Sequence, residues 1–321
     1  MEGRARPRVV YIGGAGRSGS TLTERLLGQL PGVCTVGEVV YMCQRGIVEG
    51  NRCGCGEPFR RCAFWHDVLA AAFGGWDKVN VARVAELKAA VDRTRFIPWL
   101  LAPAVRPAFR RALDEYMSYN TKLYDAIAVV SGCGVVVDSS KNASFAFCLR
   151  ACAGLELRVI HIVRDSRAVA YSWTRKVRRP EAMVPSYLPT NAPARTAWNW
   201  SYQNGALELL ARIGTPTLRV RYEDLVAAPE VTLARIAAFS GLAVGDHELG
   251  FVGSDGKRRW ADLGVAHTAS GNPMRFATGR IPIRIDDEWR TAMSAAQRAT
   301  VTAVTLPLLM HYGYLTRRPS A

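Results

Sequence analysis

The chain has 321 residues, of which 49% are hydrophobic and 21% charged, and its formal net charge at pH 7 is +15. This length allows one large α/β domain with a sizeable core or two small ones, and the composition excludes a disordered or fibrous protein. The basic residues are spread along the chain and no nucleic-acid-binding module is recognisable. The charge therefore favours a small, multiply charged anion as ligand over nucleic acid.

No apolar run approaches the roughly 18 residues that a membrane helix requires. The basic N-terminus, Met1–Arg8, is followed by too short an apolar segment for a signal peptide. We therefore expect a cytoplasmic protein without a transmembrane segment, whose eight cysteines do not by default form disulfides.

The first predicted elements are a strand over residues 9–12 and a helix that begins near Ser20. A glycine-rich loop separates them, and the helix has apolar residues at helical spacing, at Leu22, Leu26 and Leu30. A helix that follows such a loop presents unpaired backbone N–H groups and the positive end of its dipole. This stretch is therefore expected to bind an anion.

The loop resembles a phosphate-binding loop with one difference. Gly14 to Thr21 fits the pattern G-x-x-x-x-G-K-[ST] at every fixed position except that Ser20 stands in place of the lysine. The nearest cation is Arg17, inside the loop. A glycine-rich turn without a ligand is the alternative. The cation and the hydroxyl groups gathered after an N-terminal strand favour an anion site that is not an ordinary NTPase loop.

The next predicted strand covers residues 33–36 and is followed by Glu38. A carboxylate here is expected near the carboxyl ends of the strands, where open α/β sheets bind their ligands. Position alone, however, favours an ordinary surface carboxylate.

Cysteines gather in the segment that comes next, residues 51–65. Cys53, Cys55 and Cys62 are followed closely by His66, so four sulfur and nitrogen ligands are available for zinc. The spacing is not C-x₂-C and there is no second pair, so buried thiols or a disulfide are at least as well supported. We assign no metal ligand from the sequence.

Residues 76–131 have a helical pattern, and prolines separate the helices. The predicted buried positions are Val84, Leu87, Val91, Phe109, Leu113, Tyr116, Met117 and Tyr124. No pair of catalytic side chains occurs in this region. We interpret residues 45–130 as a mainly helical insertion.

Three more strands are predicted, over residues 134–138, 157–163 and 217–220, and each is followed by polar side chains. Lys141 follows the first strand, Arg164 and Ser172 follow the second, and Tyr222 follows the third. A lone lysine is usually solvated. Arg164 and Ser172 can meet one anion only if the arginine folds back across the start of the intervening helix.

Helices are expected over residues 198–212 and 229–242, and a loop over residues 267–284 that contains Arg275, Arg280 and Arg284. The last helix opens with Ser294 and Gln297 in capping-box spacing. Strands alternate with helices and no repeat or linker is found. This order predicts a three-layer α/β fold, a parallel sheet with helices on both faces, in a single domain over residues 1–321.

Two separated motifs resemble those of the sulfotransferase family, which binds 3'-phosphoadenosine 5'-phosphosulfate (PAPS). They are Arg17–Leu22 and Val163–Ser172, and further similarity covers Val220–Leu225 with Pro229 and His267–Gly279. The tyrosylprotein and carbohydrate sulfotransferases and their bacterial relatives are the most similar. The resemblance implies a P-loop-like fold and transfer of a sulfuryl group from PAPS to a hydroxyl acceptor, with release of adenosine 3',5'-bisphosphate.

The resemblance also implies roles for the cofactor-binding residues. The loop that binds the 5'-phosphosulfate is matched by Arg17, Ser18, Gly19, Ser20, Thr21 and Leu22. Arg164 and Ser172 match the pair that binds the 3'-phosphate. Tyr222 matches a residue near the nucleotide, and Arg275 falls in the late loop that closes over it.

Three residues match catalytic positions of the family. Arg17 lies at the phosphosulfate, Glu38 matches the carboxylate base of tyrosylprotein sulfotransferases, and Lys141 matches a lysine near the leaving group. The sequence Ser139-Ser140-Lys141 differs from that subfamily's motif at this position. The histidine base of cytosolic aryl and steroid sulfotransferases has no clear counterpart in this chain. The acceptor, whether a small-molecule, carbohydrate, lipid or peptide hydroxyl, is expected to be selected by residues 45–130 and 177–197.

Two other functions stay open at this point. A P-loop kinase or nucleotide hydrolase could use Val135–Asp138 as a magnesium-binding strand, although Ser20 in place of the loop lysine argues against it. A non-enzymatic anion- or nucleic-acid-binding module is suggested only by the net charge.

Overall fold

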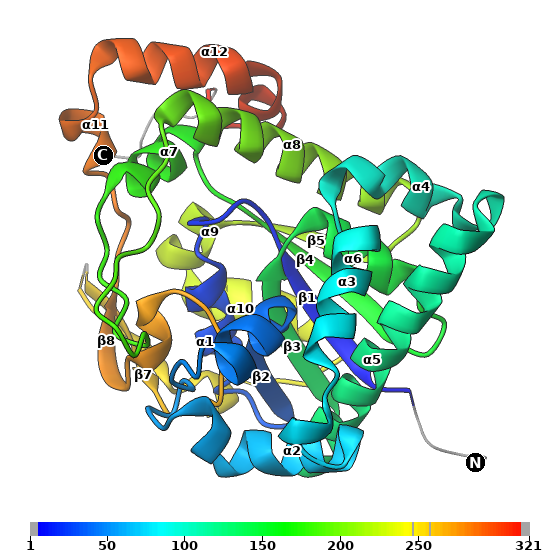
Figure 1. Cartoon of the computed structure of the whole chain (residues 1–321). Helices are drawn as coiled ribbons and strands as arrows, with labels where there is room; N and C mark the ends of the chain where they lie inside the picture. The colour runs from blue at the N-terminus through cyan, green and yellow to red at the C-terminus, as the bar shows by residue number, and fades with distance from the viewer. Residues whose placement is uncertain (1–5, 246, 257, 316–321) are drawn as a thin grey trace.

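A five-stranded parallel sheet forms the centre of the computed structural model, which describes residues 6–245, 247–256 and 258–315 (Figure 1). In spatial order the strands are β2 (Val33–Gly37), β3 (Val135–Lys141), β1 (Arg8–Gly13), β4 (Glu156–Val163) and β5 (Thr217–Arg221). The sequence prediction of a parallel α/β sheet is confirmed. Their β-branched, apolar runs suit strands that are buried on both faces.

Helices cover both faces of this sheet. Along β1, Val9 and Tyr11 belong to one hydrophobic cluster and Val10 and Ile12 to another, because successive side chains of a strand point to opposite faces. The first face is covered by α5 (Pro107–Ser131), α6 (Ala143–Arg150) and α8 (Pro193–Arg212). The second face is covered by α1 (Ser20–Leu27), α9 (Tyr222–Ala227) and α10 (Pro229–Phe239).

Four helices lie between β2 and β3. They are α2 (Ala63–Phe73), α3 (Val81–Val91), α4 (Ile97–Leu101) and α5, and prolines open α4 and α5 as their fixed φ favours. Among the predicted core positions, Leu87, Val91 and Leu113 are buried. Helix α2 lies within the insertion predicted over residues 45–130 but before Trp76, where the helical pattern was recognised.

Short helical turns connect these elements. They are the 3₁₀ turns Val39–Tyr41, Phe59–Arg61, Trp76–Lys78, Thr94–Phe96, Pro103–Val105, His247–Leu249 and Pro273–Phe276, and the π-helical Met42–Val48.

A second, antiparallel sheet was not expected from the sequence. Its strands are β6 (Val252–Asp255), β7 (Arg258–Leu263) and β8 (Gly279–Ile283), with β7 in the middle. The prediction that residues 267–284 form a loop is therefore wrong at its C-terminal end. Pro282 weakens the strand signal there, and β8 tolerates it because β8 is an edge strand.

The C-terminal region contains α7 (Ser166–Thr174), α11 (Trp289–Ala292) and α12 (Ala295–His311). The predicted capping box at the start of α12 is present, since Ser294 and Gln297 each accept a hydrogen bond from the other's backbone N–H. In Figure 1, α12 lies beside α8 at the top of the molecule. Within the described part of the chain, no helix combines the length and the apolar character needed to cross a membrane.

Candidate active site

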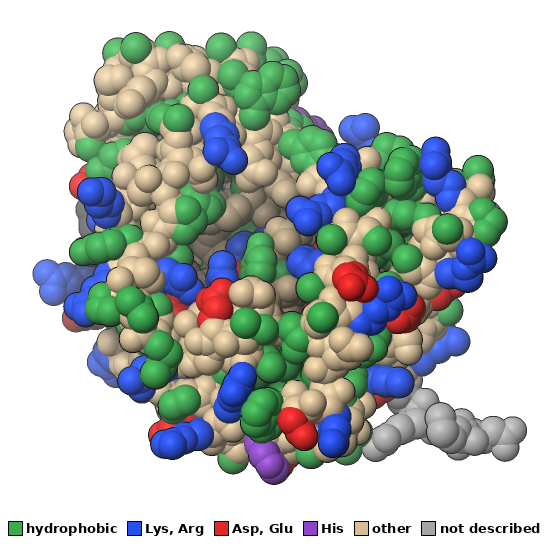
Figure 2. All heavy atoms as spheres, in the orientation of Figure 1, with side chains coloured by type: hydrophobic (Ala, Val, Ile, Leu, Met, Phe, Trp, Pro, Cys, Tyr) green, Lys and Arg blue, Asp and Glu red, His purple; other side chains and the backbone are tan. Residues whose placement is uncertain are grey.

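A cavity of about 500 Å³ opens at the carboxyl ends of β1, β3 and β4. Figure 2 shows a hollow in the middle of this face, with basic side chains gathered around it. We call two groups of lining residues the loop side and the Glu38 side. The loop side comprises Gly14, Gly16, Arg17, Gly19, Ser20, Thr21, Leu22, Arg164, Ser172, Trp173 and Tyr222, and the Glu38 side comprises Glu38, Tyr41, Arg45 and Lys141.

Two glycines allow the loop between β1 and α1 to pack closely against its neighbours. A Cβ atom on Gly14 would lie 2.3 Å from the carbonyl oxygen of Ile162 on β4. A Cβ atom on Gly19 would lie 2.3 Å from the ring of Tyr222, and Gly19 also has a φ of +95°. Only glycine suits both demands, so these positions shape the backbone that faces the cavity.

Arg17 and Lys141 have positive φ angles, of 74° and 70°, and no other non-glycine residue of the described ranges does. This conformation costs an L-residue roughly 1–2 kcal/mol, and such strain tends to occur at functional sites. The amide N–H of Gly14 donates to the carbonyl of Lys141 at 3.2 Å, which joins the two strained segments. Both strained residues line the cavity.

The guanidinium of Arg17 lies beside Trp173. Its Cζ atom is 5.3 Å from the centroid of the indole ring, and the indole Nε1 donates to the carbonyl of Gly16 at 3.1 Å. Burial lowers the pKa of Arg17, although an arginine remains a cation at neutral pH. The packing of Trp173 therefore orders a fixed positive charge inside the loop.

Arg164, which directly follows β4, also belongs to the loop side. Its Nη1 donates to the carbonyl of Arg17 at 3.2 Å, its Cζ lies 4.7 Å from the ring centroid of Tyr222, and its side chain pairs with Asp286 at 3.5 Å. Arg164 thus contacts both the loop and Tyr222, and Ser172 on α7 is the residue with which it is expected to bind one anion. Both residues line the cavity.

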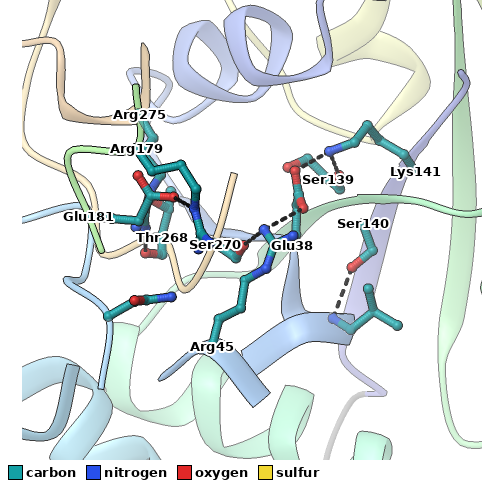
Figure 3. Close-up of polar contacts among 12 residues, drawn as sticks. Glu38, Arg45, Ser139, Ser140, Lys141, Arg179, Glu181, Thr268, Ser270 and Arg275 are labelled. Carbon is teal, nitrogen blue, oxygen red and sulfur yellow. Dashed lines mark hydrogen bonds and ion pairs between the residues drawn. The ribbon is translucent and has the colours of Figure 1, made fainter. Parts of the chain in front are cut away.

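Glu38 is only 6% exposed and lies between two cations, so it is not a surface carboxylate. Its Oε1 contacts Nζ of Lys141, and its Oε2 is 3.7 Å from Nη1 of Arg45 (Figure 3). Arg45 in turn packs over the ring of Tyr41 at 4.4 Å and donates to the Ser270 hydroxyl at 2.7 Å. These partners fix the position of the carboxylate at the cavity wall.

Two of the residues predicted from the sequence lie outside the cavity lining. Ser18 is fully buried, and Arg275 is 1% exposed. Arg275 donates from Nη1 to the carbonyl of Thr268 and from Nη2 to the carbonyl of Arg52, each at 2.6 Å (Figure 3). Its short helical turn directs the side chain into the protein, so Arg275 holds two segments together and does not face the cavity.

Several lining residues were not predicted. Besides Tyr41 and Arg45, they include Asn142, Asn199, Gln203 and Arg284. Asn199 and Gln203 are four residues apart on α8 and therefore share a face, which was the one available sequence signal. Arg45 gave no such signal, because its proximity to Glu38 depends on the π-helical turn that follows β2.

Asp138 does not occupy the position that a magnesium-binding carboxylate would need. It is fully buried, and burial raises its pKa to about 6. Its two oxygens accept hydrogen bonds from the Tyr124 hydroxyl at 2.5 Å and from the backbone and hydroxyl of Ser140 at 2.8 and 2.6 Å. The carboxylate is thus turned into the core and away from the cavity, which disfavours the kinase alternative.

Comparison with known protein families supports one assignment. Residues 7–246 match the model of the sulfotransferase family. The chain belongs to that family. Membership makes this sulfotransferase-family protein a transferase and agrees with the resemblance carried by Arg17–Leu22 and Val163–Ser172. No curated protein matches the chain significantly.

The chain is also similar to three solved structures whose names identify them as sulfotransferases. The sulfotransferase domain from the Synechococcus PCC 7002 olefin synthase is 19% identical, with 96% of each chain covered and a TM-score of 0.49. The sulfotransferase domain from the curacin biosynthetic pathway is 15% identical, with 95% of this chain and 98% of that chain covered and a TM-score of 0.49. Mouse sulfotransferase SULT7A1, complexed with PAP, is 11% identical, with 95% of this chain and 86% of that chain covered and a TM-score of 0.45.

Proposed function

We propose that this protein transfers a sulfuryl group from PAPS to a hydroxyl acceptor and releases adenosine 3',5'-bisphosphate. The observation that carries the proposal is a single cavity that is lined both by Arg17 and Arg164 and by the Glu38–Lys141 pair. Membership of the sulfotransferase family gives the reaction class.

The residues on the loop side fit a nucleotide that carries phosphate at both ends of its ribose. Gly14 and Gly19 let the loop backbone pack closely against Ile162 and Tyr222, and the N-terminus of α1 adds a positive dipole end. We assign the 5'-phosphosulfate to the segment Arg17–Leu22 and the 3'-phosphate to Arg164 and Ser172. When bound, PAPS supplies the activated sulfuryl group.

The chain's own groups carry out two tasks. Arg17 and Lys141 are placed to stabilise the negative charge that grows on the phosphate oxygen as its bond to sulfur breaks. Glu38 accepts the proton of the acceptor hydroxyl while the acceptor oxygen bonds to sulfur. The contacts with Lys141 and Arg45 hold the Glu38 carboxylate at the cavity wall, where it can meet the acceptor hydroxyl.

A second cavity of about 470 Å³ adjoins the first and shares Tyr41, Asn142 and Gln203 with it. Most of its lining is apolar, and much of it comes from the segments between β2 and β3: Phe73, Val79, Val81, Val84, Ala85, Ala89, Tyr116, Tyr119 and Leu123. We propose that the insertion over residues 45–130 binds the non-reacting part of the acceptor here. An acceptor with an apolar body suits this lining better than a polysaccharide does.

The proposal is tested first by calorimetry with adenosine 3',5'-bisphosphate and then by transfer of labelled sulfate from PAPS to a panel of hydroxyl acceptors. We expect saturable binding of the nucleotide and faster labelling of apolar alcohols and phenols than of sugars. A protein that binds neither PAPS nor its desulfated product would refute the proposal. Magnesium-dependent turnover of ATP would instead favour a kinase.

A further inference from the structure

Three cysteines and a histidine from distant parts of the chain meet at one point. The ligand atoms of Cys53, Cys55, Cys62 and His267 all lie within 4.8 Å of one another. His66, the histidine that the sequence placed in this group, is instead exposed on α2 and faces Asp67 at 3.1 Å. The sequence grouping is wrong in this residue, because the real fourth member comes from the segment after β7.

The distances within the cluster suit a tetrahedral metal site. Sγ of Cys55 is 3.8 Å from Sγ of Cys62, and Nδ1 of His267 is 3.2 Å from Sγ of Cys62 and 3.9 Å from Sγ of Cys53. Zinc bonds of ~2.3 Å to sulfur and ~2.0 Å to nitrogen place tetrahedral ligands about 3.5–3.8 Å apart. A disulfide would need its sulfurs at ~2.05 Å.

We propose that Cys53, Cys55, Cys62 and His267 bind one Zn²⁺ ion. Thiolate and imidazole ligands select zinc over magnesium or calcium, which prefer oxygen. Four protein ligands fill a tetrahedral shell and leave no position for substrate, so the site is structural. Cys53 and Cys62 are buried, and Cys55 and His267 are partly buried, as such a closed site requires.

The surrounding chain is shaped to bring these ligands together. A Cβ atom on Gly54 would lie 2.3 Å from the Thr268 hydroxyl oxygen, so only glycine lets the cysteine turn approach the histidine segment. The ring of His267 stacks on the ring of Phe64, with the two centroids 5.1 Å apart. The backbone carbonyl of His267 accepts a hydrogen bond from Nε1 of Trp65 at 2.9 Å. These contacts orient the imidazole with Nδ1 toward the sulfurs.

The metal would join two segments that Arg275 also joins. Arg275 binds the carbonyls of Arg52 and Thr268, which are the chain neighbours of Cys53 and His267. The segment after His267 lies against β2, where the carbonyl of Ser270 accepts from the Glu38 N–H at 3.0 Å. The zinc site therefore anchors, from outside the cavity, the segment on which the Glu38 backbone rests.

The test is the metal content of the full-length protein, purified without a metal-binding tag and measured by plasma mass spectrometry. We expect one zinc per chain in the wild type and in two matched controls, His66→Ala and Cys133→Ser. We expect loss of zinc in Cys53→Ser and His267→Ala. Cobalt added to the metal-free wild type should give the visible absorption bands of tetrahedral thiolate coordination, and Cys62→Ser should abolish them.

A second measurement decides the question if the ligand variants do not fold. Chelation of the wild-type protein should lower its Tm, and added Zn²⁺ should restore it. The proposal is overturned if the wild type holds no more zinc than His267→Ala, or if peptide mapping finds a disulfide among the three cysteines. Nucleotide binding is measured separately, so the failure of this proposal and that of the proposed function are distinguishable.

Discussion

The two sides of the cavity are built in different ways. Nearly all of the loop side comes from two short stretches, 14–22 and 164–173, each of which runs from the end of a strand through a turn into a helix. The Glu38 side depends on Lys141, Arg45 and Ser270, which come from three other segments of the chain. The proposed anion site thus depends mostly on local backbone, whereas the arrangement around Glu38 depends on long-range packing. Mutations should therefore separate nucleotide binding from turnover.

The largest effect is expected for Arg17→Ala, which removes the one cation inside the loop. Arg17 is placed to act on the charge that develops at the leaving phosphate, so kcat should fall by roughly 10³-fold or more. Nucleotide affinity should fall as well, because the same cation faces the bound anion. The measurement is labelled-sulfate transfer together with calorimetry. Arg150→Ala, an exposed arginine on α6, is the control, and wild-type kinetics in Arg17→Ala would show that the loop side is misassigned.

Glu38→Gln tests the Glu38 side of the cavity. Loss of a general base should lower kcat by about 10²–10⁴-fold, while the shape of the side chain is kept. Affinity for adenosine 3',5'-bisphosphate should stay close to that of the wild type, since the loop side is intact. Glu230→Gln in the first turn of α10 serves as the control. Unchanged turnover would mean that another residue is the base, and weakened nucleotide binding would mean that the two sides are not independent.

The same difference explains what could be predicted from the sequence. The strand, the glycine turn and the helix around Arg17 are contiguous, so local patterns predicted these elements and pointed to the candidate anion site. The meeting of His267 with the cysteines, and of Arg45 with Glu38, depends on how distant segments pack, and no local pattern encodes it. Arg275 shows the limit most clearly, because its segment resembles the family while its side chain points into the protein.

Arg164→Ala should weaken the binding of adenosine 3',5'-bisphosphate by about 10–100-fold, the effect of losing one or two charge-assisted hydrogen bonds. A matched ligand sharpens this test. Adenosine 5'-phosphosulfate lacks the 3'-phosphate, so its affinity should change much less in the same variant. An equal loss for both ligands would indicate that Arg164 acts through the loop, by way of its hydrogen bond to the Arg17 carbonyl, and not on the 3'-phosphate.

Glu24 links α1, which follows the loop, to the strands that carry the Glu38 side. It lies on α1, is 1% exposed, and accepts hydrogen bonds at 2.6 Å from the Gly37 N–H on β2 and from the Ser139 hydroxyl on β3. Burial is the main cause that raises the pKa of Glu24 from 4.5 to about 7, and the charge of Asp138 also raises it. The two hydrogen bonds and the charge of Lys141 lower the pKa and so offset part of this rise. The folded state therefore holds the proton of Glu24 over a pH range in which the unfolded chain has released it.

The smallest effect on activity is expected for Glu24→Gln, whose main effect concerns stability. The contribution of protonated Glu24 is fully present below pH 4.5 and is lost as the pH rises from 4.5 to about 7. A neutral glutamine does not titrate; its amide oxygen can accept from the Gly37 N–H and its amide nitrogen can donate to the Ser139 hydroxyl oxygen. The free energy of unfolding of Glu24→Gln relative to wild type should therefore rise between pH 5 and pH 8 by up to about 3 kcal/mol. Urea unfolding at both pH values measures it. If the difference does not depend on pH, Glu24 titrates normally; if nucleotide affinity or kcat changes as well, the link between the two sides carries function and not only stability.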